Sequence, residues 1–193
     1  MLEKYFKNAS EKFAKPFVLV LAKFKIKPNT VSILGLIIVL LGSYFFYVDN
    51  KFLGIILIFL GSAVDGLDGP YARYQNLVSE RGAVLDSFID RLGELFIWSV
   101  VAIGFTSNDI ELFIVLSILV ASNLIPYIRA KSESYGITNK AGITARPERV
   151  IFAVIFMFFD LDYVFMYIFS ILCWITVFLS LIHISEPTRR PII

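Results

Sequence analysis

Two pairs of aspartates stand in the second and third hydrophobic stretches of the chain. Asp65 and Asp68 are three residues apart, and Asp86 and Asp90 are four residues apart. On a helix, each spacing places both side chains on one face. Four carboxylates brought together at membrane depth would repel one another and lose hydration, unless they were partly protonated or neutralised by cations. Because carboxylate oxygens are hard ligands, the pattern predicts a site for Mg²⁺ or Mn²⁺.

Small residues accompany both aspartate pairs. Gly69 and Ala72 continue the face of Asp65, and Gly82 lies one turn before Asp86. Since small side chains let helices approach closely, we expect the two helices to be in contact at these positions. A phosphate-bearing substrate would complete the coordination of the cations. The residues alone leave a second interpretation open, because intramembrane carboxylates also serve cation-coupled transporters.

The composition indicates that lipid surrounds much of the chain. Of 193 residues, 58% are hydrophobic and 18% are charged, and the mean hydropathy is +0.76. Ordinary soluble domains carry about 25% charged residues. The net charge of +2 is too small to indicate a nucleic-acid partner. The single cysteine, Cys173, excludes a disulfide framework and a cysteine metal cluster.

The hydrophobic pattern predicts an all-α integral membrane protein with six transmembrane helices. A spanning helix needs about 20 mostly apolar residues. The candidates are residues 31–48, 52–75, 82–105, 110–130, 148–160 and 161–181. The fifth of these is short and requires Pro147 in the first turn of its helix.

The lysines and arginines indicate the orientation of these helices. Nearly all of them lie in residues 1–27, 73–81 and 129–149, and the opposite connections are short and carry one lysine. By the positive-inside bias, we expect the helices to cross the cell membrane with both termini and the aspartates on its cytoplasmic side.

We predict that the six-helix domain comprises residues 28–178 and that a different kind of segment flanks it at each end. Residues 2–15 alternate apolar and lysine positions at helical spacing, which predicts an amphipathic helix lying in the membrane interface, within a juxtamembrane segment 1–27. Pro16 is expected to interrupt it, and Asn29 or Thr30 to cap the next helix.

The C-terminal segment has an unusual sequence. Residues 179–189 resemble the translation of a transposon-type sequencing adapter, so we predict that residues 179–193 do not belong to the natural protein. His183, the only histidine, is therefore set aside as a functional candidate.

The aspartates belong to a longer pattern, D-x2-D-G-x2-A-R-x8-G-x3-D-x3-D, which the chain fits at every fixed position from Asp65 to Asp90. This pattern resembles the signature of the CDP-alcohol phosphatidyltransferase family. The resemblance implies six transmembrane helices, a homodimer, and transfer of a lipid phosphoryl group from CDP to an alcohol with release of CMP. It also implies that Asp65, Asp68 and Asp86 bind two divalent cations, with Asp90 as a further ligand or the general base. The residues that it implies for the CDP site are Gly69, Ala72, Arg73 and Gly82.

A second basic cluster bears on the acceptor alcohol. Its cations are Arg129, Lys131, Arg146 and Arg149. They would suit an acceptor that already carries a phosphate, although a positive-inside loop in contact with anionic membrane lipid would have the same charge.

The pattern around these cations favours a phosphorylated acceptor. The R-A-K-x-E-x-x-G and G-I-x-x-R-P-E-R stretches resemble phosphatidylinositol-phosphate synthases and their archaetidylinositol-phosphate relatives, which implies inositol 1-phosphate. Ala145 departs from that subfamily, in which an acidic residue is expected. Glycerol 3-phosphate is the second candidate, although the chain lacks the G-K-x-K-T stretch typical of phosphatidylglycerophosphate synthases. The lipid on CDP could be a diacyl or a diether lipid.

Overall fold

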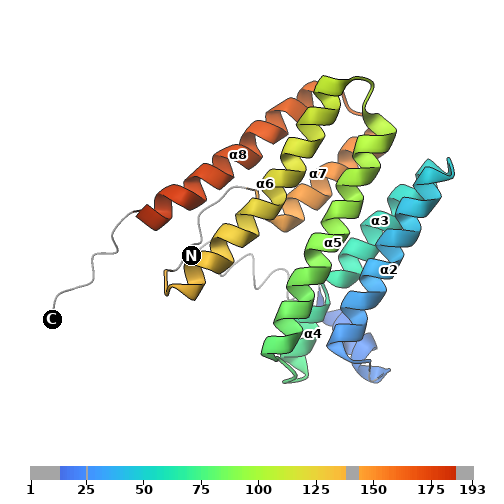
Figure 1. The fold of residues 1–193 in the computed structure, drawn as a ribbon. Coiled ribbons are helices and arrows are strands. Elements are labelled where there is room, and N and C mark those ends of the chain that lie inside the picture. Colours follow the sequence, from blue (N-terminus) through green and yellow to red (C-terminus); the bar gives the residue numbers. More distant parts are fainter. Residues whose placement is uncertain (1–13, 25, 138–143, 186–193) are drawn as a thin grey trace. The chain divides into compact units, whose positions relative to one another are not determined.

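The computed structural model describes residues 14–24, 26–137 and 144–185, and this part of the chain is helical, with no strand (Figure 1). The chain divides into two compact units, Met1–Ile97 and Trp98–Ile193. The first contains both aspartate pairs, and the second contains the basic cluster that follows them.

The first unit is built around a pair of tightly packed helices, α2 (Pro28–Tyr47) and α3 (Lys51–Asp65). Four glycines on the facing sides are seven residues apart on each helix, Gly35 with Gly42 and Gly54 with Gly61. A Cβ atom added at any of them would lie 2.7–2.8 Å from backbone atoms of the other helix. Since only glycine leaves this space, these positions set the separation of α2 and α3.

The chain breaks its helix between the first two aspartates. Gly66 and Leu67 form a turn after α3, and the short helix α4 (Asp68–Tyr74) begins directly behind it. The expected single span 52–75 is therefore two helices, and Asp65 and Asp68 do not share one continuous helix face. After a turn and an extended stretch, α5 (Glu80–Phe105) begins, and Ser79 accepts a hydrogen bond from the Gly82 N–H at 3.1 Å, as helix-capping residues do.

The second unit contains the end of α5 and three further helices, α6 (Asp109–Ser134), α7 (Arg146–Phe159) and α8 (Val164–Ser185). The Ser117 and Ser170 hydroxyls lie 2.9 Å apart and join α6 to α8. The rings of Phe152 and Phe169 stack with centroids 3.8 Å apart and join α7 to α8. Pro147 lies at the start of α7, as the expected fifth span requires.

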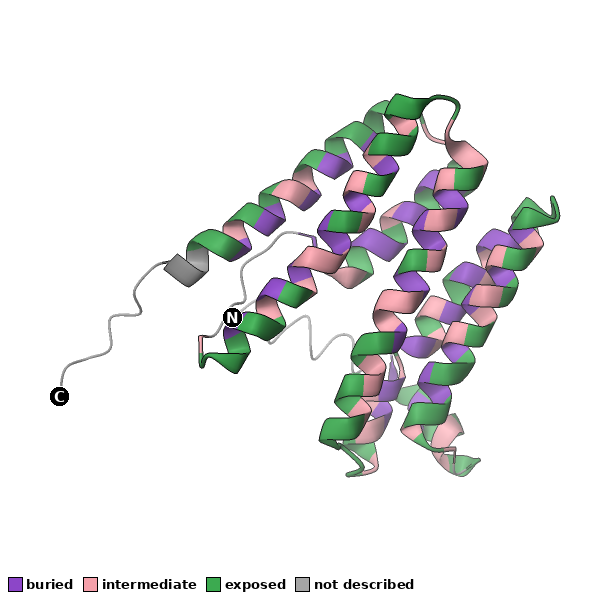
Figure 2. Cartoon of the chain, viewed as in Figure 1, coloured by how far each residue is buried: buried purple, intermediate pink, exposed green. Residues whose placement is uncertain are grey.

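Four stretches are long and apolar enough to cross a membrane: Pro28–Tyr47, Lys51–Tyr74, Asp109–Ser134 and Val164–Ile182. Figure 2 shows exposed positions recurring along these helices, and they include large apolar side chains such as Phe52, Phe113 and Ile171. Apolar surface on this scale suits contact with lipid tails. The chain is therefore a multi-pass membrane protein.

The other two expected spans do not meet the same criterion, each for a physical reason. At 26 residues α5 is long enough, but it carries the charged residues Asp86, Asp90, Arg91 and Glu94. The 14 residues of α7 rise about 21 Å, less than the roughly 30 Å of a bilayer core.

Three expectations about the ends of helices need correction or lie outside the described residues. Pro16 does not interrupt a helix, because residues 14–23 are helical on both sides of it. Lys27, not Asn29 or Thr30, is the N-cap of α2, because Pro28 already occupies the first helical position.

The expected amphipathic helix 2–15 lies outside the described residues except for its last two positions. Of the predicted adapter-derived segment 179–193, the first seven residues continue α8 and the rest lies outside the described part.

Candidate functional site

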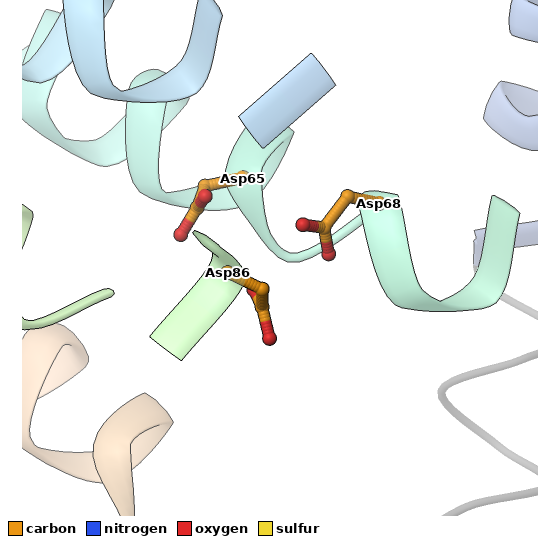
Figure 3. Close-up of side chains that lie close together, drawn as sticks. All are labelled: Asp65, Asp68 and Asp86. Carbon is orange, nitrogen blue, oxygen red and sulfur yellow. The ribbon is translucent and has the colours of Figure 1, made fainter. Parts of the chain in front are cut away.

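Three of the four aspartates come together in the first unit. Asp65 ends α3, Asp68 begins α4, and Asp86 lies near the start of α5. One carboxylate oxygen of each residue lies within 4.8 Å of the other two, and Figure 3 shows the three side chains converging. Asp65 is 3% exposed and Asp68 is 8% exposed. The turn at Gly66 and Leu67 is what lets the first two carboxylates approach Asp86 from separate helices.

Asp68 is held from two sides. The Ser32 hydroxyl, on the first turns of α2, donates a hydrogen bond to its Oδ2. The Gly69 N–H donates to its Oδ1. Ser32 is itself 2% exposed. A buried hydroxyl that donates to a carboxylate fixes the orientation of that carboxylate, which is the usual task of a residue behind a metal ligand.

Asp65 depends on the close approach of α2 and α3. A Cβ atom on Gly35 would lie 2.7 Å from the Asp65 Cβ and 2.8 Å from the Asp65 nitrogen. One of the close approaches between α2 and α3 thus falls on a residue of the carboxylate cluster. Close packing by glycine was expected near Gly69 and Gly82, but a Cβ atom at those positions would meet only side chains.

Asp90 lies one turn after Asp86 on α5 and is not a member of the group within 4.8 Å. It is half-buried. Glu94 follows at the same spacing and is buried, so the acidic face of α5 is one turn longer than the sequence interpretation recognised. The recurrence at residues 86, 90 and 94 was the signal that could have identified it.

A cavity of about 360 Å³ opens beside the carboxylates. Its walls come from three parts of the first unit: the start of α2, helix α4, and the segment that leads into α5. All four residues expected at the CDP site line it, together with Asp68 and Asp86. The complete lining is Pro28, Asn29, Asp68, Gly69, Ala72, Arg73, Leu77, Val78, Ser79, Gly82, Ala83 and Asp86.

The start of α2 was missed as part of this cavity. Pro28 and Asn29 were read only as a helix boundary, yet both line it. A Cβ atom on Gly82 would lie 3.3 Å from the Asn29 Oδ1, so glycine at this position keeps the cavity open beside the amide. The N-terminus of the 26-residue helix α5 also faces the cavity through Ser79 and Gly82, which favours an anionic ligand there.

The donor set fits a hard divalent cation. Three carboxylates at close range would repel one another without a counter-charge, and oxygen ligands are those that Mg²⁺ and Mn²⁺ prefer. The Asp68 carboxylate is oriented by Ser32 without an ion, and the close approach at Gly35 involves the Cβ atom and backbone nitrogen of Asp65.

The four cations proposed for the acceptor lie in the second unit. Arg129 and Lys131 belong to the C-terminal part of α6, and Arg146 and Arg149 to the start of α7. Lys131 and Arg149 make local contacts. The Lys131 ammonium lies 4.9 Å from the centroid of the Tyr135 ring. Arg149 is 2% exposed and its Nη1 donates to the Thr144 carbonyl at 2.8 Å. Their role in acceptor binding stays a prediction.

Comparison with known proteins gives consistent matches. The model of the CDP-alcohol phosphatidyltransferase family matches residues 25–182. Archaetidylinositol phosphate synthase of Pyrococcus horikoshii is 37% identical over 157 residues, which are 81% of this chain and 82% of that protein.

Solved structures match as well. The crystal structure of Mycobacterium tuberculosis phosphatidylinositol phosphate synthase with CDP-DAG bound has a TM-score of 0.68 and 27% identity, over 90% of each chain. The same enzyme in complex with manganese and citrate also has a TM-score of 0.68, over 89% of this chain and 85% of that chain.

Proposed function

The chain belongs to the CDP-alcohol phosphatidyltransferase family, and from this premise we propose that it transfers the phosphatidyl or archaetidyl group of a CDP-linked lipid to inositol 1-phosphate and releases CMP. The observation that carries the proposal is the convergence of Asp65, Asp68 and Asp86 beside a cavity that four further residues of the family signature line: Gly69, Ala72, Arg73 and Gly82. A cation-coupled transporter is not favoured, because the family match is to a transferase.

We assign the metal-binding role to Asp65, Asp68 and Asp86, with Asp90 as the general base. Two divalent cations, Mg²⁺ or Mn²⁺, would neutralise the pyrophosphate and stabilise the departing CMP when bound. The attacking hydroxyl forms a bond to the β-phosphorus, the bond from that phosphorus to the CMP oxygen breaks, and the hydroxyl proton passes to Asp90. In phosphoryl transfer, positioning and charge neutralisation supply most of the catalysis.

The cavity residues have complementary tasks in this scheme. Gly69, Ala72 and Gly82 leave room for the nucleotide, and Arg73 carries a guanidinium that can contact phosphate oxygens. Arg129, Lys131, Arg146 and Arg149 would bind the phosphate of the acceptor. The names of the relatives support this acceptor, since they are synthases of inositol phosphate lipids.

We further propose six transmembrane helices, with α5 and α7 as the two spans that length and composition alone do not identify. The carboxylates of α5 would face the site rather than lipid, and α7 would cross a locally thin or tilted region. The distribution of lysines and arginines supports an orientation in which the site and both termini face the cytoplasmic side of the cell membrane. A homodimer, an interfacial N-terminal helix and a catalytic domain at residues 28–178 complete the proposal.

Product analysis tests the reaction. Purified protein in detergent would be incubated with Mg²⁺ and either CDP-diacylglycerol or a CDP-diether lipid, together with inositol 1-phosphate, glycerol 3-phosphate or free inositol, and the lipid product identified by mass spectrometry. We expect an inositol phosphate lipid from inositol 1-phosphate alone, and none from the Asp90→Asn variant. A glycerophosphate product would keep the family and overturn the acceptor. Absence of product with every acceptor would contradict the proposal.

A further inference from the structure

Tyr71 connects the N-terminal helix to the cavity. It occupies an unspecified position of the aspartate signature, yet its side chain is 1% exposed. On α4 it directly precedes Ala72, which lines the cavity. Its ring belongs to a buried cluster with Ala14 and Val18 of the N-terminal helix (residues 14–23) and Val31 of α2. Three segments of the first unit therefore meet at this one side chain.

The Tyr71 hydroxyl also makes a specific bond. It donates to the Ile26 carbonyl at 2.5 Å, and the Leu21 carbonyl lies 3.4 Å from it. Leu21 belongs to the last turn of the N-terminal helix, where carbonyls have no partner within their own helix. Ile26 lies in the non-helical connection between that helix and α2. Buried backbone carbonyls need a donor, and the Tyr71 hydroxyl supplies one.

This bond lies directly behind one wall of the cavity. Pro28 and Asn29, two and three residues after Ile26, form the wall that α2 contributes, and Gly69, Ala72 and Arg73 form the wall that α4 contributes. The Ser32–Asp68 hydrogen bond joins the same two segments on the metal side. The Tyr71 bond is thus a further link between α4 and the segment that leads into α2.

We propose that Tyr71 is a positioning residue for the nucleotide part of the lipid donor. By fastening the chain at Ile26 to α4, its hydroxyl holds Asn29 at a fixed distance from the opposite wall. The helix of residues 14–23 then belongs to the donor site. This inference rests on the proposed function, because it takes the cavity to bind CDP.

The test compares Tyr71→Phe with Tyr74→Phe. Both changes remove a hydroxyl from α4, but Tyr74 is exposed and does not line the cavity. We expect Tyr71→Phe to raise the KM for CDP-lipid and the Kd for CMP, measured by equilibrium dialysis, by about three- to tenfold, the effect of losing one hydrogen bond. The kcat and the Mg²⁺ requirement should stay within about twofold, and Tyr74→Phe should match the unmodified protein.

The possible outcomes separate this inference from the proposed function. An active Tyr71→Phe variant with an unchanged KM and Kd would overturn the inference alone. A loss of kcat or of thermal stability at unchanged KM and Kd would also overturn it, because a merely structural role predicts that result. Since CMP binding is measured without turnover, the dialysis tests the inference even if no acceptor supports catalysis, in which case the proposed reaction would fail separately.

Discussion

Replacing Gly35 with alanine should damage the site through Asp65, while the same change at Gly42 should not. An added Cβ atom at Gly35 would lie 2.7 Å from the Asp65 Cβ. Non-bonded carbons prefer about 3.5–4.0 Å, so α2 and α3 must separate by about 0.8 Å or more at that point. At Gly42 the added atom would meet the Gly54 carbonyl and the Ile58 nitrogen at 2.8 Å, a comparable overlap two helical turns from Asp65.

The two variants therefore share one cost and differ in another. Overpacking costs about 1–3 kcal/mol at either position, and the gain in helix propensity from glycine to alanine, up to about 1 kcal/mol, is also common to both. A misplacement of about 1 Å at an active site can cost about 100-fold in rate. We therefore expect Gly35→Ala to lose about tenfold or more in kcat and to bind Mn²⁺ more weakly.

The assay measures CMP release and Mn²⁺ binding on both variants in detergent, together with their melting temperatures. Similar melting temperatures with a selective loss of activity and Mn²⁺ affinity in Gly35→Ala are the expected result. If Gly42→Ala loses as much activity as Gly35→Ala at the same stability, the contact at Gly35 does not position Asp65, and the reasoning is refuted.

Three further outcomes are expected. Ser32→Ala should weaken Mn²⁺ binding by about tenfold or more, with free Mn²⁺ measured by electron paramagnetic resonance. Ser32→Thr keeps the donor to Asp68 and should bind Mn²⁺ normally. Equal Mn²⁺ affinities of Ser32→Ala and the unmodified protein would show that Ser32 does not support the metal site. Chelation by EDTA should abolish CMP release, and Mg²⁺ or Mn²⁺ should restore it; activity that persists without metal would contradict the assignment of the carboxylates. Arg129→Gln should raise the KM for inositol 1-phosphate by about ten- to a hundredfold and leave the KM for CDP-lipid unchanged. An equal rise in both KM values would argue against a role of Arg129 in binding the acceptor.

The grouping of three of the four aspartates could be predicted from the sequence because it depends on local spacing. Asp65, Asp68 and Asp86 converge as their pattern indicated, and Gly69 and Gly82 line the cavity. The observed helices likewise lie close to the ranges predicted from the hydrophobic stretches, because the length of an apolar stretch is a local property of the sequence.

Other features depend on contacts between distant parts of the chain. Ser32 and Asp68 are 36 residues apart, and nothing in the spacing around either residue predicts their hydrogen bond. The break at Gly66 was missed because the aspartate spacing was interpreted on one continuous helix, although glycine and an adjacent aspartate are common in turns. The glycine contacts of α2 and α3 were missed for a similar reason: seven-residue spacing identifies a helix face but not its partner.

The most direct test of the account is the Mg²⁺ dependence of CMP release from CDP-lipid and inositol 1-phosphate, compared between the unmodified protein and Asp86→Asn. We expect the unmodified protein to release CMP only with added Mg²⁺, and Asp86→Asn to lose nearly all activity. In metal-free buffer the melting temperature of Asp86→Asn should be at least as high as that of the unmodified protein, because one of three mutually repelling carboxylates has been neutralised. Full activity of Asp86→Asn, or CMP release that does not require a divalent cation, would contradict the central claim that these aspartates form the metal site of a CDP-alcohol phosphatidyltransferase.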